Sequence, residues 1–129
     1  MTPQSTAKII ETAISIHWMD SEGIICSVSK PGERTLAKIK ETFEAYALLT
    51  AGKKFCLLVD TNNTSSMQKE LREYISANLP KFFNAMAVIS KKPLQATLAN
   101  VFLKFSWKRF PIKLFTSESE AREWLREYL

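Results

Sequence analysis

Polar and apolar residues alternate in two short stretches near the start of the chain. From Thr12 to Trp18 the alternation has the period of a strand with one buried face. Asp20-Ser21-Glu22-Gly23 has the composition of a turn, and the apolar pattern resumes from Ile24 to Val28. The two segments and the turn between them predict an antiparallel hairpin at the start of the fold.

A continuous apolar run follows in the middle of the chain. Phe55-Cys56-Leu57-Leu58-Val59 contains no polar residue and ends at Asp60, which predicts a parallel strand buried on both faces. The polar stretch Thr61-Asn62-Asn63-Thr64-Ser65-Ser66 comes directly after it. In open α/β sheets ligands bind beside the carboxyl ends of strands, so this loop is where we expect function.

Helical and extended patterns alternate through the rest of the chain. The stretches whose apolar residues fall on one helical face are 36–47, 67–75, 94–105 and 121–128, and the further extended runs are 84–89 and 111–115. The order β-β-α-β-α-β-α-β-α predicts an α/β fold, with a mainly parallel sheet and an N-terminal antiparallel hairpin. No segment has linker composition, so we expect a single domain over 1–129.

Two of the predicted helices begin with capping signals. Ser65 with Gln68, and Ser117 with Glu120, fit the capping-box pattern. In this pattern the serine hydroxyl accepts a hydrogen bond from an amide of the first turn. Pro80 is expected to end the helix that follows Ser65, because proline lacks the amide hydrogen that a helix interior needs.

The composition is that of a globular domain. The chain has 129 residues, of which 46% are hydrophobic, enough to bury a core. No stretch approaches the ~20 consecutive apolar residues of a membrane span, and the N-terminus lacks the basic and apolar regions of a secretory signal. Cys26 and Cys56 lie in apolar runs, where we expect buried free thiols in a reducing compartment. We therefore expect a cytoplasmic protein.

Residues for catalysis or cofactor binding are few. His17 is the only histidine, and its alternation with apolar neighbours predicts an exposed position or the edge of a pocket; no metal site is expected. Ser66 and Lys69 match the S-x-x-K pattern of penicillin-recognising enzymes, but the companion motifs are absent. The glycines form neither a dinucleotide-binding motif nor a P-loop. We expect no enzymatic activity and no cofactor, and Asp60 should accept backbone hydrogen bonds rather than act as a base.

Basic residues are concentrated in the segment 91–113, which contains no acidic residue, and the formal net charge of the chain is +5. Trp107 and Phe110 interleave with these cations, as in surfaces that stack bases or enter a membrane interface. We favour the alternative, a helix whose lysine stems cover core aromatics. No helix-turn-helix, zinc-finger or RNA-recognition signature is present, so nucleic acid is not an expected partner. The cations are Lys91, Lys92, Lys104, Lys108, Arg109 and Lys113.

The order of elements, the polar turn from Asp60 to Ser66 and the closing segment together resemble a STAS-type domain. The closing segment is Ile112-Lys113-Leu114-Phe115-Thr116-Ser117-Glu118-Ser119-Glu120-Ala121-Arg122-Glu123-Trp124-Leu125. The STAS family includes the bacterial anti-sigma-factor antagonists and a broader set of uncharacterised proteins. The chain is most similar to the broader set, and the resemblance runs from about residue 12 to the end.

The resemblance implies a site in the loop after Asp60. In the antagonists, a partner kinase phosphorylates a serine or threonine in the loop after the third strand. The matching stretch here is Asn63-Thr64-Ser65-Ser66-Met67, which puts the acceptor at Thr64 with Ser65 beside it. The acidic residue and the glycine of the family's motif are absent. The competing interpretation is that Thr64, Ser65 and Ser66 are helix-capping hydroxyls.

These patterns predict a non-enzymatic binding or regulatory module that contacts a protein partner through the loop from Asp60 to Ser66. The alternative is a carrier of a small apolar molecule or lipid. Its pocket would lie between the sheet and the aromatic helix near Phe102, Phe105 and Trp107. The sequence leaves both a monomer and a homodimer open.

Overall fold

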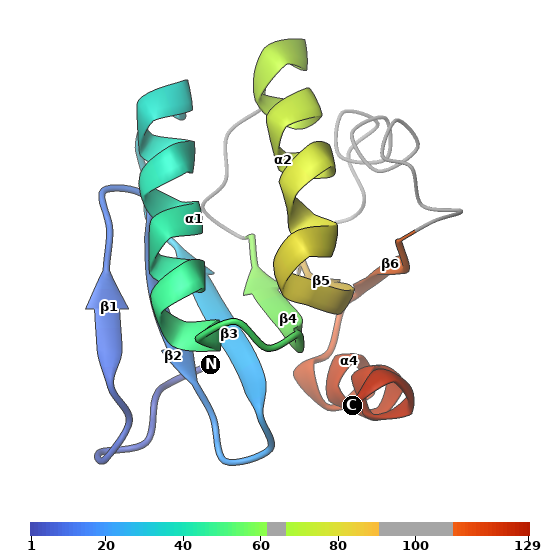
Figure 1. Cartoon of the computed structure of the whole chain (residues 1–129). Helices are drawn as coiled ribbons and strands as arrows, with labels where there is room; N and C mark the ends of the chain where they lie inside the picture. Colours follow the sequence, from blue (N-terminus) through green and yellow to red (C-terminus); the bar gives the residue numbers. More distant parts are fainter. Residues whose placement is uncertain (62–66, 91–109) are drawn as a thin grey trace.

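The computed structural model describes residues 1–61, 67–90 and 110–129 and shows an α/β fold built on one mixed sheet (Figure 1). Over these residues the sheet has six strands in the spatial order β1-β2-β3-β4-β5-β6. The strands are β1 (Ile9–Glu11), β2 (Ser15–Met19), β3 (Ile24–Ser29), β4 (Phe55–Asp60), β5 (Phe83–Ile89) and β6 (Ile112–Phe115). The helices are α1 (Leu36–Thr50), α2 (Lys69–Phe82) and α4 (Glu118–Leu125), with the 3-10 helix η1 (Arg126–Tyr128) after α4. The predicted α/β class is confirmed.

The sheet changes from antiparallel to parallel at β3. β1 pairs with β2, and β2 with β3, in antiparallel register. The pairs β3–β4, β4–β5 and β5–β6 are parallel. The predicted N-terminal hairpin is β2–β3, and the parallel part of the sheet follows it. The sequence pattern does not predict β1, because Ile9–Glu11 is too short to show a hydrophobic period.

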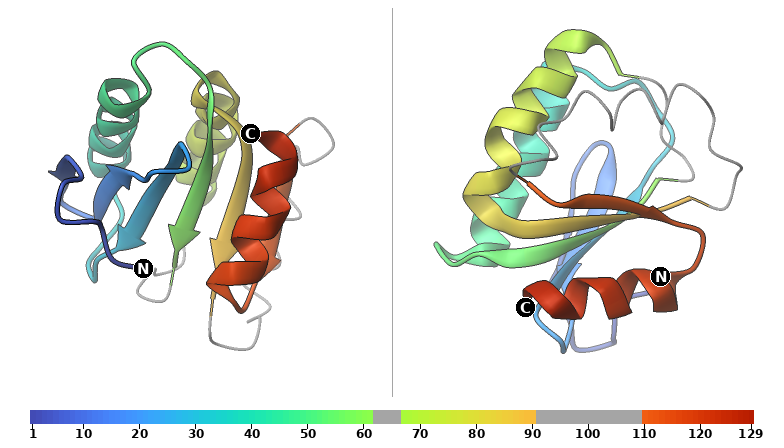
Figure 2. Two further views of the ribbon diagram at one scale, coloured as in Figure 1. Left: turned by 90° about the horizontal axis from the view of Figure 1, so that it is seen from below. Right: turned by 90° about the vertical axis from the view of Figure 1, so that its right-hand side faces the viewer.

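Helices cover both faces of the sheet. α1 and α2 lie on one face and α4 lies on the other (Figures 1 and 2). On the first face, Phe43, Tyr46 and Leu79 belong to one core cluster. On the opposite face, Ala121 and Leu125 of α4 belong to a second cluster. Each face of the sheet therefore has its own hydrophobic core.

The strand β4 lies between β3 and β5 and contributes to both cores. Leu57 packs in the cluster with α1 and α2, whereas Cys56 and Leu58 pack in the cluster with α4. These three side chains are at most 1% exposed. The prediction of a central strand buried on both faces is confirmed.

The ends of α2 differ from the prediction. Gln68 is the N-cap and its side chain makes no capping hydrogen bond. The predicted capping box of Ser65 and Gln68 is wrong, because the extended backbone of Gln68 delays the helix until Lys69. Pro80 does not end the helix, which continues to Phe82. The amide of Phe83 donates a hydrogen bond to the carbonyl oxygen of Leu79. The last turn is therefore closed although Pro80 has no amide hydrogen to donate.

The second predicted capping box is confirmed at its serine. Ser117 is the N-cap of α4, and its hydroxyl accepts a hydrogen bond from the Glu120 amide at 3.3 Å. The helix predicted over 94–105 lies outside the described residues.

Candidate functional site at the carboxyl edge of the sheet

The carboxyl ends of the parallel strands meet at one edge of the sheet. β3, β4, β5 and β6 run in the same direction, so the segments that follow them start along this edge. Asp60 ends β4 and is in register with Val28 of β3 and Ile89 of β5. The predicted site residue Asp60 therefore lies at the end of a central strand, with the ends of β3 and β5 on either side.

The side chain of Asp60 belongs to the sheet face that α4 covers. Strand residues alternate between faces, and Cys56 and Leu58 of the same strand pack in the core with α4. Val28 and Ile89, the cross-strand neighbours of Asp60, pack against this core too. A partly exposed carboxylate thus lies in a row of apolar side chains.

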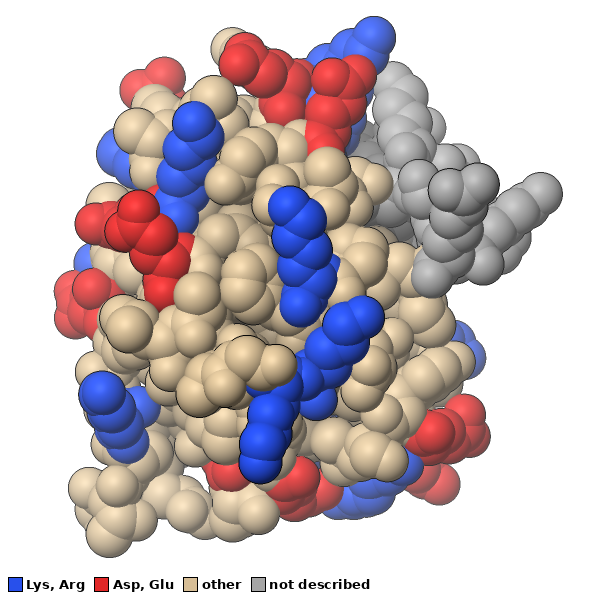
Figure 3. All heavy atoms as spheres, in the orientation of Figure 1, with Lys and Arg blue, Asp and Glu red and all other residues tan. Residues whose placement is uncertain are grey.

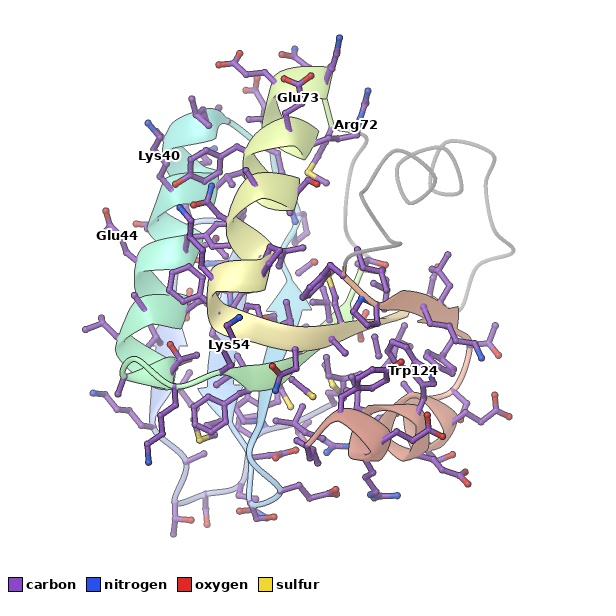
Figure 4. All side chains as sticks on the ribbon, turned by 45° about the vertical axis from the view of Figure 1, so that its right-hand side comes forward. Lys40, Glu44, Lys54, Arg72, Glu73 and Trp124 are labelled. Carbon is purple, nitrogen blue, oxygen red and sulfur yellow. The ribbon has the colours of Figure 1, made fainter. Side chains whose placement is uncertain are left out.

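Both described ends of the loop after β4 are anchored. The amide and the hydroxyl of Thr61 donate hydrogen bonds to the carbonyl oxygen of Ile89, at 3.1 and 3.2 Å. At the other end, Nη1 of Arg72 donates to the carbonyl oxygen of Met67 at 2.8 Å. Arg72 projects from the first turns of α2 (Figure 4). The loop is therefore tied to β5 at one end and to α2 at the other.

The predicted acceptor and contact residues Thr64, Ser65 and Ser66 lie outside the described residues. The structure places the anchors of their loop, Thr61 and Met67, and the neighbouring carboxylate of Asp60. The role of the three hydroxyls stays a prediction. The carrier pocket predicted near Phe102, Phe105 and Trp107 also lies outside the described residues and stays a prediction.

The connection from β3 to α1 starts at the same edge and is held by a buried arginine. Nη1 of Arg34 donates to the carbonyl oxygens of Lys30 and Gly32, at 2.7 and 2.9 Å, and Nη2 donates to that of Ile14 at 3.4 Å. Burial lowers the pKa of Arg34, because the charged guanidinium is desolvated. The hydroxyl of Thr35 then caps α1 by accepting from the Lys38 amide. Arg34 thus holds this loop in place. The sequence pattern does not predict this role.

His17 occupies a different place from the one predicted. It is 0% exposed, not at the surface or a pocket edge. Its Nδ1 lies 2.7 Å from Oγ of Ser27, and its Nε2 lies 3.1 Å from Oγ1 of Thr12. The Ser27 hydroxyl is also 3.0 Å from the phenol oxygen of Tyr46 on α1. The alternation correctly separates His17 from Ile16, but it does not reveal that α1 covers the face to which His17 points.

The imidazole and hydroxyl of this cluster have the spacing of a base and a nucleophile, but they are closed off from solvent. Ser27 is 2% exposed, so a substrate has no access to its hydroxyl. Burial lowers the pKa of His17 to about 4 and raises that of Tyr46 to about 12, with the Ser27 hydrogen bond opposing the latter. Both side chains are therefore neutral at pH 7.

The two cysteines are buried free thiols, as predicted. Burial, helped by the nearby Asp20 carboxylate, raises the pKa of Cys26 to about 12. Burial alone raises that of Cys56 to about 11. Neither thiol is a ready nucleophile at neutral pH, because only the thiolate reacts.

The basic segment 91–113 is only partly described. Phe110 is 6% exposed and belongs to the core with α1 and α2. The interpretation that lysine stems cover the aromatics of this segment stays a prediction. Nζ of Lys113 lies 5.5 Å from the ring centroid of Phe115. The other cations of the segment lie outside the described residues. Figure 3 shows charges of both signs scattered over the face that carries α1 and α2.

Other kinds of site receive no support from the described parts of the chain. Within 1–61, 67–90 and 110–129, no three His, Cys, Asp or Glu side chains are grouped so that they could hold a metal ion. Among the same residues, no helix has the length and apolar character needed to cross a membrane.

The fold and the anchored edge loop define an α/β domain with a mixed sheet and a candidate binding edge. The chain belongs to the family described as "Domain of unknown function (DUF7793)", whose model matches residues 17–129. The match starts at His17, so β1 and Thr12 precede it. No curated protein and no solved structure matches the chain.

Proposed function

We propose that this chain is a non-enzymatic binding or regulatory module that docks a protein partner on the carboxyl edge of its sheet. The contact surface is the loop from Asp60 to Ser66 and the start of α2. The observation that carries the proposal is the position of Asp60 between the ends of β3 and β5, next to a loop anchored at both described ends. Anchoring favours binding, because less conformational entropy is lost when a partner orders the loop.

The topology favours a protein partner over an enclosed small molecule. In doubly wound sheets, small ligands bind in the crevice where successive crossovers leave to opposite faces. Here α1 and α2 pack in the same core cluster, so the crossovers on either side of β4 share one face. Among the described residues, the two crossovers beside Asp60 therefore do not form that crevice, which favours contact with another surface.

The STAS resemblance supplies a form of regulation for this module. Phosphorylation of Thr64 or Ser65 adds negative charge to the loop that follows Asp60 and changes partner affinity. Lys69 and Arg72, in the first turns of α2, are the first described cations that follow this loop in the chain. The module would then switch by electrostatics, without a catalytic group of its own.

Pull-down from a lysate of the source cell tests this proposal. The bait is the whole chain, either wild-type or with Thr64→Glu, Ser65→Glu or Asp60→Asn, and the captured proteins are compared by quantitative mass spectrometry. Ser21→Glu is the matched control, because Ser21 is exposed in the β2–β3 turn, at the opposite end of β3. We expect the loop variants to lose or gain a defined partner and the control to behave as wild type.

The native protein provides the second arm of the test. Its intact mass, measured after purification from the source cell, should include a phosphorylated form whose site maps to Thr64 or Ser65. Equal partners in equal amounts for every bait, together with an unmodified native mass, would contradict the switch. Apolar molecules released from the purified protein by organic solvent would then support the carrier.

A further inference from the structure

The buried cluster around His17 joins four parts of the fold. Thr12 lies between β1 and β2, His17 is on β2, Ser27 is on β3 and Tyr46 is on α1. The His17 and Tyr46 rings also meet edge to face, with centroids 5.1 Å apart. One imidazole thus links the first strand of the sheet, through Thr12, to the centre of the molecule.

The hydrogen bonds of this cluster form one consistent chain when the imidazole is neutral. The Thr12 hydroxyl donates to the carbonyl oxygen of Ser15 at 3.2 Å, so its oxygen can accept from Nε2–H of His17. Nδ1 of His17 then accepts from the Ser27 hydroxyl, and the Ser27 oxygen accepts from the Tyr46 phenol. Every donor in the chain has an acceptor.

A proton on Nδ1 leaves this chain with one hydrogen too many. Nδ1–H must donate to the Ser27 oxygen, so the hydroxyl hydrogen of Ser27 has to turn away. Its only other neighbour in the cluster is the Tyr46 oxygen, and a hydrogen turned there displaces the hydrogen of Tyr46. A buried donor without an acceptor is costly, and no carboxylate in the cluster compensates the imidazolium charge.

From this geometry we propose that the hydrogen bonds of His17 form a pH-sensitive contact, which holds β1 and Thr12 on the sheet at neutral pH and releases them in mild acid. The surplus hydrogen is on the Ser27 side, but release occurs at Thr12, because movement of its segment lets water reach the charged ring. Tyr46 is held in the core by Phe43 and Phe83, and Ser27 lies on β3 between two paired strands. β1, in contrast, has three residues, lies at the border of the described sheet and leaves Ile9 50% exposed.

Release of β1 changes the binding properties of the sheet. β2 becomes the border strand, with five residues whose backbone groups can pair with another extended segment. The family match begins at His17 and leaves out β1 and Thr12. The contact between His17 and Thr12 therefore joins the matched domain to the segment that precedes it.

The charged groups around this corner are held by other partners. Glu11 of β1 pairs with Lys30 at 2.7 Å, and Lys30 also donates to the Thr12 carbonyl oxygen at 3.1 Å. Glu41 of α1 accepts from the Ala13 amide at 2.8 Å. Arg34 reaches the carbonyl oxygen of Ile14. Since Glu11 and Glu41 both contact this corner through their carboxylates, each needs its own control variant.

The direction of the effect follows from the two states. In the closed state β1 is paired with β2, and in the open state β1 is released. The pKa of His17 is about 4 in the closed state and has its ordinary value of 6.5 in the open state, so the open state binds more protons between pH 4 and 6.5. The closed state is fully stabilised above pH 6.5, and this stabilisation is lost as the pH falls toward 4. Its opening constant should rise about tenfold for each pH unit in this window.

Amide hydrogen exchange of the whole, ¹⁵N-labelled chain tests the proposal at pH 7, 6 and 5. Protection factors, which remove the intrinsic pH dependence of exchange, are compared for the Thr12 amide, which is bonded to Ser15, and for amides of β4. We expect Thr12 and the β1–β2 ladder to lose protection by about tenfold per unit below pH 6.5, while β4 keeps its protection. His17 is the only histidine, so its ring signals report the titration directly.

Three variants separate the imidazole from the carboxylates. His17→Gln should remove the pH dependence of Thr12 protection, whereas Glu11→Gln and Glu41→Gln should keep it. The wild-type measurement decides alone if His17→Gln does not fold. Constant Thr12 protection between pH 7 and 5, parallel loss of protection in β4, or loss of the dependence in Glu11→Gln or Glu41→Gln would overturn the proposal.

Discussion

At the scale of single residues, the position of Leu58 shows how strongly the central strand is constrained. Leu58 is 0% exposed and packs in the cluster with Ala121 and Leu125 of α4. Its strand neighbours on both sides, Leu57 and Val59, point to the opposite face. A change at Leu58 is therefore felt by the α4 core, whereas the core with α1 and α2 keeps its own side chains.

Leu58→Ala should lower the free energy of unfolding by roughly 2 to 5 kcal/mol, because it removes buried methyl groups and leaves a cavity. Leu48→Ala is the matched control, since Leu48 on α1 is 70% exposed and should change stability little. Urea unfolding of both variants measures the difference. Equal midpoints for Leu58→Ala and the wild type would show that Leu58 is not in a packed core.

His17 shows what a sequence pattern leaves out at this scale. The alternation around it correctly puts His17 on the opposite face from Ile16. Whether that face is exposed depends on α1, whose Tyr46 arrives from a distant part of the sequence and covers the ring. Asp60 is predictable for the opposite reason, because the end of an apolar run is visible without knowing what packs on it.

At the scale of elements, charged side chains bind α4 to the β2–β3 hairpin. Arg122 of α4 forms ion pairs with Asp20 in the hairpin turn and with Glu118 one helical turn earlier. Burial opposes its charge, but the hydrogen bonds with Asp20 and Glu118 hold the pKa of Arg122 above its ordinary value. Arg126 pairs with Glu22 of the same turn, at 3.0 Å, on an exposed surface. The pair of Arg122 with Asp20 is the more buried of the two connections.

Arg122→Met should destabilise the fold by roughly 3 kcal/mol, because it leaves the largely buried Asp20 carboxylate without its cation. Arg126→Met is the control on the same helix and should change stability little, since exposed ion pairs contribute little. Thermal unfolding compares the two variants. The interpretation is wrong if Arg126→Met costs as much as Arg122→Met.

Elements with a clear period are predictable here, and their ends are not. The apolar spacing correctly predicts α1, α2 and α4, and the apolar runs predict β3, β4 and β5. α2 starts at Lys69 because the backbone of Gln68 is extended. The sequence does not show this, because the serines before Gln68 match a capping pattern that would start the helix earlier. β1 is held by its pairing with β2 and by the ion pair of Glu11 with Lys30, both of which are contacts with later parts of the chain.

At the scale of the whole molecule, the excess of positive charge has no single focus among the described residues. Several of its cations are already paired with carboxylates, and charges of both signs share the face in Figure 3. Binding to a polyanion gains free energy from counterions released by unpaired cations. The described surface should therefore attract nucleic acid only weakly. The paired cations are Lys30, Lys69, Arg122 and Arg126.

Fluorescence anisotropy with a labelled DNA duplex of generic sequence tests this expectation. At physiological salt the Kd should be weaker than about 10⁻⁴ M, the weak end of non-specific binding, and should change little with salt, because few phosphates are neutralised. A variant with Lys91, Lys92, Lys104, Lys108 and Arg109 changed to Gln is the control. A tight complex with a steep salt dependence, lost in this variant and kept in Thr64→Glu, would move the binding surface from the Asp60 loop to the basic segment. Weak binding by both proteins agrees with a partner that recognises the carboxyl edge by shape and local charge, not by the net charge of the chain.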